Sequence, residues 1–218
     1  SFNNTGSGEL GVFTTAPYTL YPLGTLAGTT VTKTGLALAT GNNLNVIANS
    51  GKIFIAPMIG WDMSPVVGAS NFFGTSPLAP NTTLANTTTG NLVRGTGVVT
   101  TGATGASRGW GGIGFNTANA AASISANKFF TFTIKPNAGY SMNLGSVSPF
   151  DYRRSSTGPP NILVQYKINN DAYVDLYVDT LPTTSSSGAQ FSAKNLTAIA
   201  ALQNVQEIST VTFRIVPY

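Results

Sequence analysis

The stretch that decides the fold is Asn161-Ile-Leu-Val-Gln-Tyr-Lys-Ile-Asn-Asn-Asp-Ala-Tyr-Val-Asp-Leu-Tyr-Val-Asp179. Apolar and polar residues alternate on both sides of an Asn-Asn-Asp centre, which predicts two antiparallel strands joined by a tight turn. A two-residue turn pairs Ile168 with Asp171 and sets an apolar face against an acidic one. A three-residue loop over 169–171 pairs Ile168 with Ala172 and matches the two apolar faces, so the sequence favours that loop.

This register also predicts which side chains of the second strand face solvent. Successive side chains of a strand point to opposite faces, so one face is buried and the other is exposed. The buried face is then made of Ala172, Val174, Leu176 and Val178. The exposed face is made of two tyrosines and two aspartates: Tyr173, Asp175, Tyr177 and Asp179.

Two further segments show the alternation of half-buried strands. In 128–135 the apolar face holds Phe130, Phe132 and Ile134, and Pro136 follows directly. In the last segment, 211–215, Thr212 and Arg214 face outward while Val211, Phe213 and Ile215 face inward. One segment differs, because 196–202 is rich in Ala and Leu and predicts one or two helical turns.

The composition describes a neutral, polar surface over an apolar interior. Charged residues are 8% of the 218 residues, against about 25% in an average soluble protein. The apolar fraction of 42% is enough to bury a core. The length fits one large all-β domain, or one domain with a smaller appendage. Neutral surfaces repel one another weakly, so this composition favours association of the chain with copies of itself.

The same composition excludes several functions. The chain has no histidine and no cysteine, which removes the usual proton shuttle, thiol nucleophiles and thiolate metal sites. Only Asp62 and Asp151 can be proposed as a glycosidase pair, and nothing in the sequence brings them together. We therefore expect no enzyme activity and no cofactor. The basic residues are scattered, so we expect no nucleic-acid partner. Prolines and threonines interrupt the uncharged stretch from Leu10 to Thr32, so we expect no membrane span.

Calcium is the one metal that the sequence leaves open. The ladder of Asp171, Asp175 and Asp179 supplies carboxylates, the ligands of a hard cation. Alternate positions of a straight strand are about 6–7 Å apart, so these carboxylates do not share one ion. A solvent-exposed face is the preferred interpretation of the ladder, and a calcium site built from loop carbonyls stays possible.

From about Trp61 to the end, the order of several motifs resembles a known family. These motifs are Asn91-Leu-Val-Arg-Gly-Thr-Gly-Val98, Gly109-Trp-Gly111, Lys128-Phe-Phe-Thr-Phe-Thr-Ile134, Pro136-Asn-Ala-Gly-Tyr140, Asp151-Tyr-Arg-Arg-Ser-Ser-Thr-Gly-Pro159, Leu202-Gln-Asn-Val205 and Val211-Thr-Phe-Arg-Ile215. The series is similar to the jelly-roll β-sandwich module of secreted bacterial surface proteins that often carry PEP-CTERM or type IX sorting tails. The resemblance implies a secreted, cell-surface protein, related in shape to carbohydrate-binding and adhesion domains, and it implies no reaction.

The resemblance divides the chain into two parts. Residues 56–218 are expected to form an all-β, jelly-roll-type antiparallel β-sandwich. Residues 1–55 lie outside the resemblance and still contain strand-like segments, among them 30–33 and 52–56. These strands extend the sandwich, form a small second sheet, or add to the open edge of a neighbouring molecule.

Two functions follow from these expectations. The first is a non-catalytic extracellular structural or adhesive protein that assembles with itself at the bacterial cell surface as a filament or lattice. The alternative is a carbohydrate-binding module, in which surface aromatic residues stack on sugar rings while Asp and Arg hold the hydroxyl groups. An arginine pair also suits a carboxylate of an acidic sugar, although Asp151 pairing with a neighbouring arginine is the simpler interpretation of that cluster. The candidate residues for binding a polysaccharide are Trp61, Trp110, Tyr152, Arg153, Arg154, Tyr173, Asp175 and Tyr177.

Overall fold

The computed structural model describes residues 2–3, 32–33, 58–147, 150–184 and 187–218. The chain divides into two compact units, Ser1–Ala56 and Pro57–Tyr218. In the first unit, β1 (Phe2–Asn3) pairs antiparallel with β2 (Thr32–Lys33). The other strands predicted for residues 1–55 lie outside the described residues.

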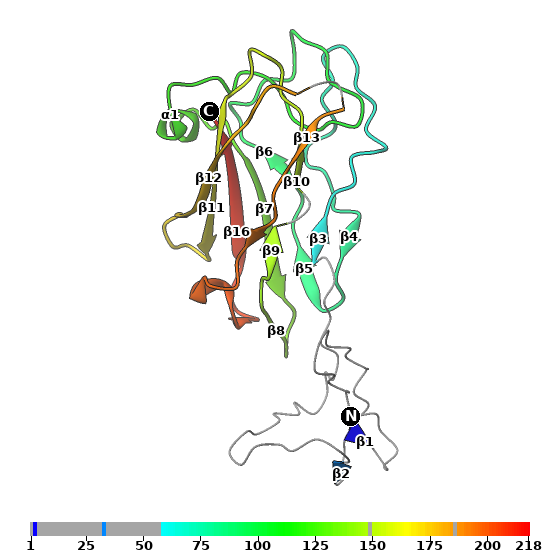
Figure 1. The fold of residues 1–218 in the computed structure, drawn as a ribbon, viewed down its shortest axis with the longest axis vertical. Helices are drawn as coiled ribbons and strands as arrows, with labels where there is room; N and C mark the ends of the chain where they lie inside the picture. The colour runs from blue at the N-terminus through cyan, green and yellow to red at the C-terminus, as the bar shows by residue number, and fades with distance from the viewer. Residues whose placement is uncertain (1, 4–31, 34–57, 148–149, 185–186) are drawn as a thin grey trace. The chain divides into compact units, whose positions relative to one another are not determined.

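The second unit is built on one six-stranded antiparallel sheet (Figure 1). The predicted all-β class is therefore confirmed. Along the sheet the strands run in the order β12 (Val174–Thr180), β11 (Asn161–Ile168), β16 (Val211–Pro217), β7 (Phe130–Pro136) and β5 (Thr87–Thr89), and β6 (Val93–Arg94) also pairs with β7.

Short ladders form a second layer in front of this sheet (Figure 1). Three of them join the same two chain segments, which therefore form two antiparallel strands with interruptions. The ladders join β8 (Ser141–Met142) to β15 (Val205–Gln206), β9 (Ser146–Val147) to β14 (Lys194–Asn195), and β10 (Phe150–Tyr152) to β13 (Ala189–Phe191), while β3 (Ile59–Gly60) pairs with β4 (Thr82–Thr83).

An insertion separates two of these ladders and carries the predicted helical turn. The Leu196 amide donates to the carbonyl of Gly145, and the Leu144 amide donates to the carbonyl of Leu202. Residues 197–201 therefore have no opposite residues on the partner segment, and they loop out as a 3₁₀ turn, η1 (Ala200–Leu202). The turn places Leu202 fully inside the core, with no exposed surface.

The hydrophobic core lies between the sheet and the ladders. One cluster joins Ile134, Tyr166, Val211 and Phe213 of the sheet to Met142, Leu144, Leu196, Leu202 and Val205 of the second layer. A second cluster joins Ile162 and Val164 to Leu181 and Phe191. The inward faces predicted for β7 and β16 are confirmed. The arrangement is consistent with a β-sandwich, and the jelly-roll connectivity stays a prediction.

The hairpin of β11 and β12 follows the predicted register only near its loop. Tyr166 lies opposite Val174, as the three-residue loop requires, but beyond a bulge Val164 lies opposite Tyr177. Leu176 and Tyr177 consequently both pack inward, because a β-bulge sets two residues of one strand against one residue of its partner. The expectation that Tyr173, Asp175, Tyr177 and Asp179 share one outward face is therefore wrong. Val178, predicted to be buried, is turned outward and is 60% exposed.

One helix, α1 (Ala120–Ser125), was not predicted. Asn119 begins it, accepting a hydrogen bond from the Ala122 amide at 2.9 Å through its side-chain oxygen. The fully buried hydroxyl of Ser123 donates to the carbonyl of Pro217, which fixes the helix against the outer face of β16. In the described part of the chain no helix has the length and apolar character needed to cross a membrane.

Candidate functional site

The two tryptophans proposed for sugar stacking are both held in packing contacts. The Trp61 ring packs edge-on against Phe132 with centroids 5.0 Å apart, and its Nε1 donates to the carbonyl of Leu78. The Trp110 ring packs on Phe130 at 5.0 Å and lies 4.4 Å from the guanidinium carbon of Arg94. Each of the two indole rings is therefore held against a phenylalanine of β7.

Arg94 connects two of the glycine-containing motifs, 91–98 and 109–111. Its Nε donates to the carbonyl of Gly111, and its Nη2 donates to the carbonyls of Phe73 and Gly74, the latter at 2.8 Å. Burial lowers the pKa of Arg94 from its ordinary value, although the guanidinium stays charged. The side chain therefore fastens two loops, one at 73–74 and one at 111, to one strand, which is a structural role.

The cluster from 151 to 154 does not form an arginine clamp. Asp151 accepts a hydrogen bond from Nε2 of Gln190 at 2.7 Å, so the predicted pairing of Asp151 with a neighbouring arginine is wrong. Arg154 donates to the carbonyl of Gly158 and to the hydroxyl of Thr183. Tyr152 stacks on Phe191 with centroids 4.6 Å apart, whereas Arg153 is exposed.

Tyr177 and Asp179 meet Lys194 on the inner side of the sheet. Nζ of Lys194 lies 2.6 Å from Oδ2 of Asp179 and 5.1 Å from the centroid of the Tyr177 ring. The hydrogen bond from Lys194 lowers the pKa of Asp179, and burial raises the pKa of Tyr177 to about 12. Tyr177 therefore links β12 to the second layer.

This raised pKa gives a testable pH dependence. The folded-state pKa of Tyr177 lies above the value of about 10 for an unperturbed tyrosine, so the folded chain holds the phenolic proton more tightly. The associated stability is present below about pH 10 and is lost as the pH rises toward 12. We expect Tyr177→Phe to weaken the fall in the free energy of unfolding over this range, measured by urea unfolding at several pH values. An identical fall in both proteins would contradict the burial of this phenol.

The outer face of the large sheet brings together a different set of polar side chains. Asp175, Gln165, Arg214 and Thr131 lie side by side across β12, β11, β16 and β7. Nε of Arg214 donates to Oε1 of Gln165 at 2.8 Å, and Nε2 of Gln165 donates to Oδ1 of Asp175 at 2.7 Å. The guanidinium carbon of Arg214 also lies 3.6 Å from the centroid of the Tyr173 ring. We call Tyr173, Asp175, Gln165, Lys167 and Arg214 the outer-face cluster.

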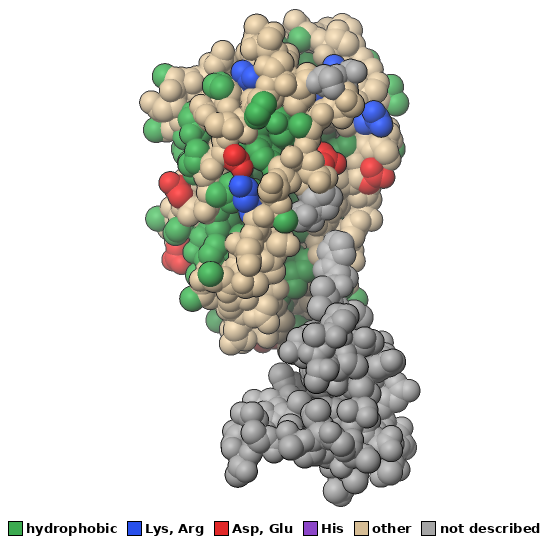
Figure 2. All heavy atoms as spheres, in the orientation of Figure 1, with side chains coloured by type: hydrophobic (Ala, Val, Ile, Leu, Met, Phe, Trp, Pro, Cys, Tyr) green, Lys and Arg blue, Asp and Glu red, His purple; other side chains and the backbone are tan. Residues whose placement is uncertain are grey.

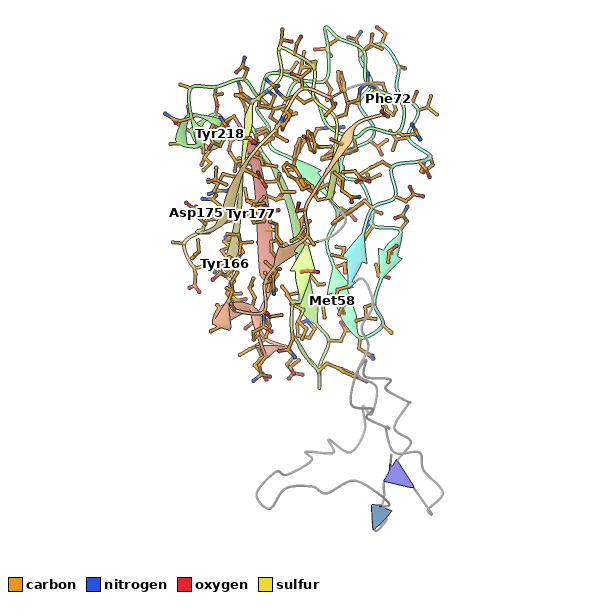
Figure 3. The ribbon with its side chains drawn as sticks, viewed as in Figure 1. Met58, Phe72, Tyr166, Asp175, Tyr177 and Tyr218 are labelled. Atoms are coloured by element: carbon orange, nitrogen blue, oxygen red, sulfur yellow. The ribbon has the colours of Figure 1, made fainter. Side chains whose placement is uncertain are left out.

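Of the eight residues predicted to bind a glycan, only Tyr173 and Asp175 lie in this cluster. Figure 3 labels Asp175 and Tyr177 on β12, where the bulge separates their faces. Sequence reasoning placed Arg214 on an outward face but did not single it out. The alternation in β16 indicated that Arg214 faces outward. Its neighbours follow from the pairing of β11 with β16, which brings Arg214 beside Gln165 although the two are 49 positions apart in the sequence.

The described residues include no group of three or more acidic side chains arranged to hold a metal ion. Asp175 and Asp179 face opposite sides of the sheet because the bulge lies between them. The aspartate ladder therefore cannot act as one calcium site. The opposite faces of Asp175 and Asp179 are a second reason, besides the distance between the carboxylates along the strand.

Comparison with known proteins identifies no relative of this chain. No family model, no curated protein and no solved structure matches this chain. The resemblance to the secreted jelly-roll module therefore stays a prediction.

Proposed function

We propose that this protein is a non-catalytic structural or adhesive protein of the bacterial cell surface that assembles with copies of itself. The observation that carries the proposal is the open edge of the large sheet. Among the described residues, β12 pairs with β11 alone, so its other edge carries no strand. An open edge presents unpaired backbone N–H and C=O groups, which a strand of another chain completes.

The residues of β12 suit such an addition. The strand is seven residues long, and Val174 and Val178 are 49% and 60% exposed. β-Branched residues favour extended pairing, so an added strand finds apolar side chains on both faces of this edge. Figure 2 shows a face of mostly neutral atoms on which basic and acidic side chains are few and scattered, so little charge repulsion opposes the approach of a second copy.

The charge of β12 indicates what kind of strand is added. Antiparallel pairing of two β12 strands centred on Tyr177 sets Asp175 of one copy opposite Asp179 of the other, and like charges in that position destabilise a sheet. The incoming strand therefore carries neutral or basic residues. Two strand-like segments of the N-terminal part have a lysine and no acidic residue: 30–33, in which 32–33 pair with β1 along one edge, and 52–56. We propose that one of them, from a second copy, adds to β12.

The carbohydrate-binding alternative loses its original aromatic platform. Trp61, Trp110 and Tyr152 each pack against a phenylalanine, and Lys194 and Arg214 lie against Tyr177 and Tyr173. Stacking of a sugar ring on these residues requires rearrangement. Self-assembly is therefore the function that the geometry supports better.

A pair of double variants tests the assembly edge. Val174→Lys with Val178→Lys places two charges at the edge, and burying unpaired charges opposes the addition of a strand. We expect at least about a tenfold weaker self-association, equivalent to about 1.4 kcal/mol, in sedimentation velocity over a concentration series.

The matched control adds the same two charges away from the edge. Val67 and Ile208 are 70% and 82% exposed and lie outside β12. Val67→Lys with Ile208→Lys is expected to associate as the wild type does. Equal weakening by both double variants would instead assign the effect to net charge and contradict the role of β12.

A further inference from the structure

The outer-face cluster holds an arginine that is fixed in place and, across the described ranges, is in direct contact with no carboxylate, although Asp175 lies close enough to attract its charge. The guanidinium of Arg214 lies against Tyr173 at 3.6 Å, and Phe129 lies 5.4 Å away. Within the part of the chain that the structure describes, only its Nε takes part in a hydrogen bond, to Gln165. Among the described residues, neither terminal nitrogen of Arg214 has a hydrogen-bond partner. The planar end of the side chain therefore keeps donors for a ligand.

Gln165 separates the guanidinium of Arg214 from the carboxylate of Asp175. The glutamine is 7% exposed, and its amide donates to Asp175 while its oxygen accepts from Arg214. It stands between the carboxylate of Asp175 and the guanidinium of Arg214 and is hydrogen-bonded to both. Both polar atoms of this buried side chain are satisfied, so the separation is a stable feature of the sheet.

A second cation and two threonines lie on the same face of the sheet as the arginine. Nζ of Lys167 lies 5.3 Å from the centroid of the Tyr173 ring that Arg214 also contacts. Thr212 lies opposite Lys167, and Thr131 lies opposite Arg214 in the register of the sheet. The surface thus combines two positive charges with threonine side chains.

We propose that the outer-face cluster binds carboxylate groups of an acidic polysaccharide, with Arg214 as the bidentate donor and Lys167 as a second positive charge. A planar carboxylate matches the donor geometry of a guanidinium. The threonine hydroxyls hydrogen-bond sugar hydroxyls, which an acidic peptide does not offer. The low density of positive charge disfavours a polyphosphate backbone. This binding uses side chains on the outer face of the sheet, whereas strand addition uses the backbone edge of β12, and Tyr173 supports the arginine without stacking on a sugar.

Affinity electrophoresis and titration calorimetry with polygalacturonate test the proposal. The wild type is expected to bind this polymer, to bind more weakly as salt is raised, and not to bind the neutral polymer pullulan. Arg214→Lys keeps the charge but loses the fork, and Arg214→Gln loses both, so we expect at least tenfold weaker binding for each. Lys167→Gln, which leaves Arg214 untouched, is expected to weaken binding severalfold.

Arg108→Gln supplies the matched control, because Arg108 is exposed and its removal lowers the net charge equally. We expect binding unchanged from the wild type in this variant, and thermal unfolding confirms that each variant is folded. The proposal is overturned if the wild type does not bind polygalacturonate, or if Arg108→Gln weakens binding as much as Arg214→Gln. It is also overturned if dextran sulfate and a polyglutamate peptide bind as tightly, because binding then reflects charge alone.

Discussion

The Arg94→Ala variant is expected to lose about 3–5 kcal/mol of unfolding free energy. Its guanidinium donates to the carbonyls of Phe73, Gly74 and Gly111, and a hydrogen bond to a charged group contributes about 1.5–3 kcal/mol. The substitution removes these bonds and the contact with Trp110 together, so the separate contributions do not add fully. Urea unfolding monitored by tryptophan fluorescence measures the loss.

Two further variants separate the roles of charge and geometry at this site. Arg94→Lys keeps the charge but cannot reach three carbonyls with a planar fork, so we expect it to recover at most half of the loss. Arg153→Ala removes an exposed arginine and is expected to change stability by less than about 0.5 kcal/mol. A similarly small effect of Arg94→Ala would show that the two loops hold together without this side chain.

The second large effect is expected at Leu202. This side chain has no exposed surface and packs in the cluster that joins the sheet to the second layer. Truncation of a buried leucine to alanine costs about 2–5 kcal/mol, because transfer free energy is lost and a cavity remains. We expect Leu202→Ala to lower the free energy of unfolding by this amount, measured by urea unfolding.

Ile208→Ala is the matched control, since Ile208 is 82% exposed and its loss is expected to change stability by less than about 0.5 kcal/mol. The insertion of 197–201 directs Leu202 inward, and the Gln203 side chain fixes it by donating to the carbonyls of Leu144 and Leu196. A loss below about 1 kcal/mol in Leu202→Ala would contradict the anchoring role of this turn.

The sequence predicted the parts of the fold that depend on local alternation. The inward faces of β7 and β16, the three-residue loop and a helical turn near Leu202 follow from the spacing of apolar residues. The helix α1 was missed because it is only six residues long, although Asn119 before an alanine run is the signature of its start.

The bulge in β12 could not be predicted from the hairpin alone. Simple alternation buries Val178, whereas the structure partly buries Tyr177 and exposes Val178. The partners that favour this choice are the cluster containing Phe191 and the side chain of Lys194, and both belong to the second layer. A strand pattern contains no information about such a partner, so the predicted tyrosine face was wrong.

The candidate site depended in the same way on contacts between distant segments. Gln165 and Arg214 become neighbours because β11 pairs with β16, and the sequence does not give the order of strands in a sheet. The aromatic residues drew the prediction because sugar-binding sites use exposed rings, yet most of these rings are packed against phenylalanines. The sequence indicates which side chains have the chemistry to bind a sugar, but it could not identify the partners that these side chains contact.

Hydrogen exchange of β12 at low and high protein concentration tests the assembly edge most directly. If copies join by strand addition, amides of Val174–Thr180 gain protection as the concentration rises, while those of the interior strand Val211–Pro217 stay equally protected. An oligomer whose β12 amides exchange as in the dilute sample would contradict the proposed edge. A chain that stays monomeric throughout the series would contradict self-assembly itself.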